Sequence, residues 1–180
     1  MPTENIDEVR ETLSRIYGAV AAVVRDDVIG SDVLLADLHE SFGDFSELLA
    51  ALSFATLDRL DAALATGDVL SPRERRAMAQ FLLTEAHRYA LLSAGGPASG
   101  VSGVPVESAA RRLDAVRRHD HEQVLAEIED ARSVSSDADL LWGATALLTA
   151  VVAMWAQRSG QSPRRAAADL CMAVSVAAAC

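Results

Sequence analysis

The stretch from Leu140 to Ala156 carries no charged residue, and it sets the main constraint on what this chain can fold into. After a short arginine-containing loop, a second run rich in alanine continues to Cys180. A helix that is apolar on every side must be surrounded by other helices, by lipid or by a second copy of itself. The remainder of the chain therefore has to cover this segment unless a membrane or a twin chain does so.

A membrane is the least favoured of these surroundings. Trp142 and Trp155 lie near the two ends of the run, as in the aromatic belt of a membrane span. However, the run is shorter than the ~20 residues that a span needs, and Gly143 and Thr149 lower its hydropathy. The mean hydropathy of the whole chain, +0.17, is that of a soluble protein. We therefore expect a soluble protein in which this run is either the core of one chain or the interface of a homodimer.

Small residues along the run favour close helix packing. Ala146, Ala150 and Ala153 would let the backbone of another helix approach closely, and we predict them as contacts with a second copy. The expected partner is accordingly the chain itself, as a homo-oligomer. The alternative, in which the same alanines pack inside one chain, stays open at this point.

The composition predicts an all-α fold. A chain of 180 residues can bury a core as one domain, alanine is the best helix former, and aromatic residues make up only 4%. We predict a bundle of six or seven helices with a buried apolar C-terminal helical hairpin. Within one domain, residues 1–93 form an acidic helical half and residues 107–180 an apolar one. Residues 94–106, rich in Gly, Ser and Pro, form a connector that is either a linker or a lid.

Periodicity and start signals place the helices. Ser71, Pro72 and Glu74 form a strong start signal, because serine can cap the helix, proline suits its first turn and glutamate can bond back to the cap. Ser162 and Pro163 repeat part of this pattern. The predicted helices cover residues 5–25, 32–40 (capped by Ser31), 44–67, 71–93, 107–132, 139–157 and 163–180.

The charge pattern excludes several functions. The chain has no lysine, so all 16 basic residues are arginines, which a GC-rich coding genome explains. Without lysine the protein can form neither a Schiff base nor a P-loop. A formal net charge of −10 argues against nucleic acid as a partner. Cys171 and Cys180 are about 13 Å apart along one predicted helix, too far for a bridge, and the acidic N-terminus is unlike a signal peptide. We therefore expect a cytoplasmic protein.

Charged residues inside apolar stripes are the candidates for chemistry. Glu85 projects beside the apolar ridge of the predicted fourth helix, and Asp120, with His121 at its edge, interrupts the stripe of the fifth. If these residues converge, a buried carboxylate would have a raised pKa and could act as a general acid or base. The candidate catalytic residues are Glu85, Asp120 and His121. The candidate pocket residues are Tyr89, Trp142 and Arg117.

A structural explanation of the same residues competes with this one. Arg117 can pair with Asp120, and Glu85 with Arg88, while a helix break near residues 118–121 would remove the anomaly. The adjacent arginine pairs, among them Arg111 and Arg112, are expected to form solvated ion pairs.

No cofactor or metal is expected. His119 and Glu122 share a helix face, but the sequence has no second cluster with the spacing of metal ligands. The glycines of the connector follow no strand and form no nucleotide-binding pattern.

Two functions follow as hypotheses. The first is a cytosolic, self-associating interaction or assembly protein that uses its apolar C-terminal hairpin and has no evident catalytic motif. The alternative is a small-molecule-binding protein, or a cofactor-independent enzyme, that uses buried acid and base residues on an apolar substrate. The sequence leaves open whether the protein is an enzyme.

Overall fold

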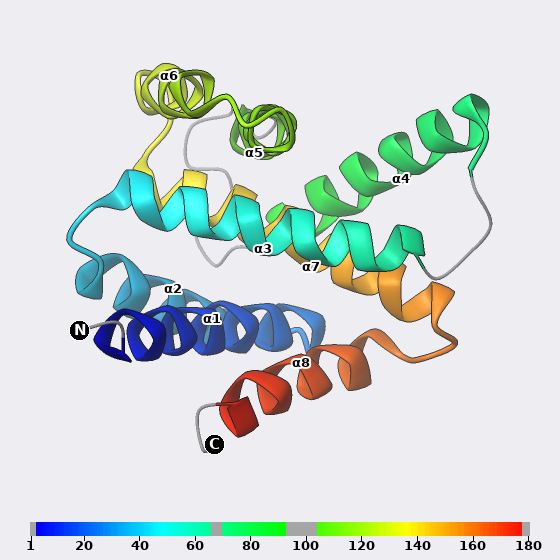
Figure 1. Cartoon of the computed structure of the whole chain (residues 1–180), viewed down its shortest axis with the longest axis horizontal. Coiled ribbons are helices and arrows are strands. Elements are labelled where there is room, and N and C mark those ends of the chain that lie inside the picture. The colour runs from blue at the N-terminus through cyan, green and yellow to red at the C-terminus, as the bar shows by residue number, and fades with distance from the viewer. Residues whose placement is uncertain (1–2, 66–69, 93–103, 178–180) are drawn as a thin grey trace.

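The computed structural model describes residues 3–65, 70–92 and 104–177, and over these ranges the chain forms eight α-helices and no β-strand. The predicted all-α bundle is therefore confirmed (Figure 1). The helices are α1 Thr3–Val24, α2 Val28–Ser41, α3 Phe45–Ala65, α4 Pro72–Ala90, α5 Val104–Arg117, α6 His121–Arg132, α7 Asp137–Arg158 and α8 Pro163–Ala177.

Helix α7, which contains the uncharged run, is the centre of the molecule and packs against all the other described helices. It crosses the molecule behind α3, with α5 and α6 on one side and α1, α2 and α8 on the other (Figure 1). By length and composition α7 could cross a membrane, but 78% of its most apolar window is buried inside the protein. Its hydrophobicity is thus satisfied by its own chain, as in the core helix of a soluble protein.

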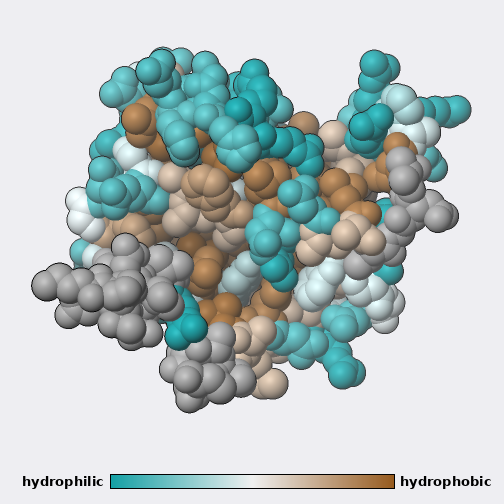
Figure 2. Space-filling model, viewed as in Figure 1, coloured by the Kyte–Doolittle hydropathy of each residue, from teal (hydrophilic) through white to brown (hydrophobic). Residues whose placement is uncertain are grey.

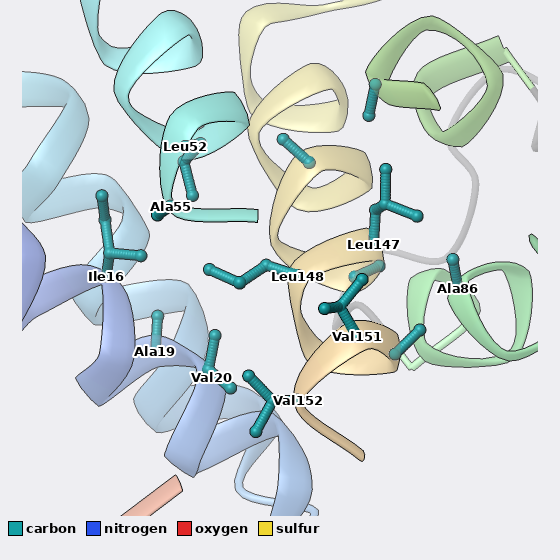
Figure 3. Close-up of a cluster of buried hydrophobic side chains, with 14 of the residues drawn as sticks. Ile16, Ala19, Val20, Leu52, Ala55, Ala86, Leu147, Leu148, Val151 and Val152 are labelled. Atoms are coloured by element: carbon teal, nitrogen blue, oxygen red, sulfur yellow. The ribbon is translucent and has the colours of Figure 1, made fainter. Parts of the chain in front are cut away.

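The core around α7 is built from helices of both halves of the sequence. Figure 3 shows Leu148 directed toward α1 and α3, and Val152 beside Val20 of α1. Leu52 of α3 and Ala86 of α4 close the same cluster. Each large aliphatic side chain buried in this way contributes about 1.5–3 kcal/mol relative to an exposed one.

The alanines predicted as a dimer interface lie inside this core. Ala146 and Ala150 are completely buried by neighbouring helices of the same chain, and only Ala153 is partly exposed. They are not available to a second copy in this structure, so the predicted interface is wrong for Ala146 and Ala150. The small residue that allows the closest approach is Gly143. A Cβ added there would lie 2.5 Å from the Cβ of Pro105, where α5 crosses α7.

The predicted helix over residues 107–132 is also wrong, because it is two helices. The turn between α5 and α6 places His119 in the left-handed region, with φ of 57°. The amide of Asp120 donates to the Ala115 carbonyl at 3.0 Å and that of His119 to the Val116 carbonyl at 3.0 Å, which is a Schellman ending. The Asp120 carboxylate then caps α6 by accepting from the amide of Gln123 at 3.0 Å.

Of the other predicted helix boundaries, one is confirmed and others differ from the structure. The capping box at the start of α4 is confirmed, since Ser71 and Glu74 each accept from the other's backbone amide. Helix α2 starts earlier than predicted, at Val28, with Asp27 as its cap, and Ser31 is buried within it. Most of the predicted connector, residues 94–103, lies outside the described residues, and its last three residues already belong to α5.

Candidate functional site

The three predicted catalytic residues do not form a common site in the described part of the chain. Glu85 is partly exposed and paired with Arg88, whose Nη2 lies 2.7 Å from Oε2. Asp120 is exposed and occupied as the cap of α6, and His121 is the exposed first residue of that helix. Because the turn at His119 directs the chain outward, neither Asp120 nor His121 interrupts an apolar stripe as the sequence had indicated.

Tyr89 and Trp142, which were predicted to line a pocket, are buried and make contacts within the fold. The indole Nε1 of Trp142 donates to Oδ1 of Asp32 at 2.5 Å and so ties α7 to α2. The guanidinium of Arg88 lies over the Tyr89 ring, with Cζ 4.4 Å from its centroid, and burial raises the pKa of the phenol. Neither residue lines either of the cavities described below.

Arg117 is the one predicted pocket residue that does line a cavity. Its Nη2 pairs with Oδ1 of Asp61 on α3 at 3.1 Å, and not with Asp120 as expected. This pair lies at the rim of an apolar groove between α3, α4 and α5. Arg117 therefore borders a groove that contains none of the other predicted site residues, and its role in ligand binding stays a prediction.

The groove has a volume of about 220 Å³, and Leu147 of α7 lines it from below. Apolar side chains reach the surface between the polar side chains of α5 and α4 on the face shown in Figure 2. The lining residues are Leu57, Leu60, Ala79, Leu82, Leu83, Ala110, Leu113, Asp114, Arg117 and Leu147. Of these only Asp114 and Arg117 are charged.

The charges at the mouth of the groove are already compensated. Arg117 pairs with Asp61, and Arg118 pairs with Asp114 at 3.0 Å, all four side chains being more than half exposed. Exposed pairs of this kind contribute little to stability, but together they leave the mouth without net charge. The groove thus offers an apolar floor and a polar, electrically balanced rim.

A second cavity, of about 470 Å³, lies among α1, α2 and the start of α3 and is more polar. The cation in its lining, Arg15, is bound to Glu11 at 2.5 Å, to Asp37 at 3.0 Å and to the Ser41 hydroxyl at 2.8 Å. Because its lining is more polar and its cation is already engaged, this cavity suits an apolar ligand less well than the groove does.

No match to the chain is found among models of protein families, curated proteins or solved structures. Within the described residues, no group of three or more His, Cys, Asp or Glu side chains is placed to hold a metal ion. The function therefore has to be argued from the groove and from the buried polar groups themselves.

Sequence reasoning missed the most unusual polar residue, Arg112. It is completely buried on α5, whereas its neighbour Arg111 forms the solvated ion pair expected of both. A signal was present in the sequence. Arg112 is three or four residues from Ser108, Ala109 and Ala115, and such small side chains on one helix face leave room for a long one.

Proposed function

We propose that this protein binds a small, neutral, apolar molecule in the groove between α3, α4 and α5. The observation that carries the proposal is the lining, in which apolar side chains from four helices surround an open cavity of about 220 Å³. Sites for small molecules are typically concave and apolar, with a few polar groups that orient the ligand. At the ~30 Å³ that a water molecule occupies in the liquid, the groove accommodates roughly seven or eight non-hydrogen atoms.

The balanced rim supports a neutral ligand. An anion would have to compete with Asp61 for Arg117, and a cation with Arg118 for Asp114. A hydroxyl or carbonyl group at one end of an aliphatic ligand can instead hydrogen-bond to either pair without breaking it. An aliphatic alcohol or ketone of about six or seven carbons is therefore the chemical class that the groove favours.

The proposal is for binding and not for catalysis. Glu85, Asp120 and His121, the acid and base candidates, do not line the groove. We also propose a cytosolic location, which is supported by the burial of α7, the candidate membrane helix found among the described residues.

The test is to titrate the full chain with 1-alkanols of increasing length and to measure the affinity of each by calorimetry. Each added methylene buried is worth about 0.8 kcal/mol, so affinity should rise about 4-fold per carbon and level off near seven carbons. Ala79→Trp should abolish binding, because the indole fills the groove from α4.

The matched control is Ala77→Trp. This alanine is also exposed on α4 but does not line the groove, so the variant should bind like the wild type. If the two tryptophan variants bind equally well, or if the wild type shows no length-dependent affinity, the groove is not the binding site.

Self-association is a second candidate, with a different surface from the one first expected. Ile29 and Val33 lie one turn apart on α2 and are 75% and 63% exposed, which favours contact with a second copy over exposure to water. In this case light scattering should give a dimer for the wild type and a monomer for Val33→Asp. Val134→Asp, at an exposed apolar residue outside the helices, should remain dimeric. A monomeric wild type rules this candidate out.

A further inference from the structure

Arg112 of α5 is a buried cation whose hydrogen bonds are incomplete. The side chain is 0% exposed, and Nη1 donates to the hydroxyl of Ser108 at 2.7 Å. Its other two nitrogens, Nε and Nη2, are buried and make no hydrogen bond in this structure. A buried charge without a counter-ion is strongly disfavoured, so an arrangement of this kind requires a reason.

The two unpaired nitrogens belong to the same edge of the guanidinium plane. The N–H groups of Nε and Nη2 point in nearly parallel directions and form the fork that binds two oxygens of one oxyanion. Nη1, on the other side of the group, is the nitrogen that Ser108 occupies. What is missing at Arg112 is therefore one two-oxygen acceptor.

A carboxylate of the protein lies nearby but is held by other residues. Oε2 of Glu127 accepts from Nε of Arg111 at 2.6 Å, and Oε1 accepts from Nε2 of Gln123 at 2.9 Å. Arg111, Arg112 and Glu127 together therefore carry a net charge of +1, although only Arg111 is bonded to the glutamate. The pKa of Arg112 is lowered to about 10, chiefly because the side chain is buried; Glu127 opposes this shift and Arg111 adds to it.

We propose that the fork of Arg112 binds the carboxylate of a small ligand at the seam between α5 and α6. A single carboxylate would supply both missing acceptors and neutralise the remaining positive charge. The Ser108 hydroxyl, which accepts from Nη1, also lies 3.5 Å from the Glu127 carbonyl oxygen of α6, so the guanidinium lies beside the contact between α5 and α6. Because the Arg112 side chain is fully buried, binding requires an outward shift of α6, which packs chiefly against α5. Arg112 does not line the apolar groove, so this site is separate from the proposed function.

The first experiment measures the melting temperature of the full chain as sodium acetate replaces sodium chloride at constant ionic strength. The wild type should show a saturable rise of about 5–10 °C at a hundred times Kd. Arg112→Met removes the fork while keeping much of the volume. It should melt above the wild type in chloride, because the unpaired charge is gone, and should not respond to acetate.

Two further arms distinguish the sources of the acceptor. Glu127→Gln removes the internal carboxylate and should retain the acetate response. If the response appears only in this variant, Glu127 occupies the fork in the wild type and the proposal is overturned. Inorganic phosphate, which carries more than one charge at neutral pH, should give the smaller shift, and a larger one would overturn the assignment to a carboxylate.

A measurement on the wild type alone keeps the proposal testable if Arg112→Met does not fold. The Nε–H resonance of Arg112 should shift on titration with acetate, while that of Arg111, already bonded to Glu127, should move little. If both resonances shift alike, or neither does, acetate does not bind at the fork.

Discussion

At the scale of single residues, Gly143 shows how little space separates two helices in this fold. The absence of a side chain there lets the backbone of Pro105 lie directly on α7, since an added Cβ would come within 2.5 Å of both its Cβ and its carbonyl carbon. Contact with backbone cannot be relieved by a change of side-chain rotamer. Any larger residue at this position has to push α5 away from α7.

We predict that Gly143→Ala lowers the free energy of unfolding by about 1–3 kcal/mol, the usual cost of overpacking. Denaturant unfolding of the full chain measures this. Gly43→Ala is the matched control, because nothing lies within 4 Å of its added Cβ. That variant should be neutral or more stable by about 0.4–1 kcal/mol. Equal effects of the two substitutions would contradict the close crossing.

Glu127 should make stability depend on acidic pH. The bond from Arg111, helped by Gln123 and opposed by burial, holds the pKa of this carboxyl below its ordinary range. Its contribution to folding is therefore complete above the ordinary glutamate pKa of about 4.3 and is lost as pH falls through the lower pKa of the folded state. The difference in unfolding free energy between the wild type and Glu127→Gln should shrink between pH 6 and pH 2.5. A difference that does not change with pH would show that the carboxylate is not held in this way.

Residue-level prediction from the sequence worked where the chemistry is local. The capping box of Ser71 and Glu74 could be predicted because both partners lie within one turn. Arg112 was missed, because the small residues on its helix face are only an indirect signal of burial and the adjacent Arg111 is an identical residue that forms an ion pair. For Asp120 the sequence left two interpretations open, and the structure agrees with the helix break near residues 118–121, because Asp120 caps α6.

At the scale of elements, three helices end with the same hydrogen-bond pattern but with different residues. Gly160 ends α7 with φ of 68°, the usual solution, whereas Asp26 and His119 occupy the same left-handed region with φ of 62° and 57° after α1 and α5. Glycine takes this conformation without strain, while other residues do not. The break after α5 has no glycine to mark it, so the sequence offered it only as an alternative to one helix over residues 107–132. The described residues form eight helices in place of the seven expected.

We predict that His119→Gly raises stability by about 1 kcal/mol, and the melting temperature by about 2–4 °C, by removing this strain. Ala126→Gly, an exposed position inside α6, should have the opposite effect and cost about 1 kcal/mol. Thermal unfolding of both variants by circular dichroism measures the two effects. If both glycines destabilise the chain, the turn at His119 is not left-handed in solution.

At the scale of the whole molecule, α7 accounts for the arrangement of the other helices. The sequence predicted an apolar helix that must be covered, and the structure covers it with helices from both halves of the chain. Periodicity could not decide whether α7 is the core of one chain or a dimer interface, because both arrangements bury the same residues. Only the contacts between distant segments distinguish the two arrangements. The groove was likewise beyond prediction, since its lining comes from four helices that are brought together only by folding.

Hydrogen exchange across a range of protein concentrations tests most directly whether α7 is the core of one chain. Amides of α7 should exchange most slowly, at a rate set by global unfolding, and their protection should be the same in dilute and concentrated solution. Protection of α7 that increases with protein concentration would show that a second copy completes its burial. Fast exchange of α7 at every concentration would contradict its place at the centre of the fold.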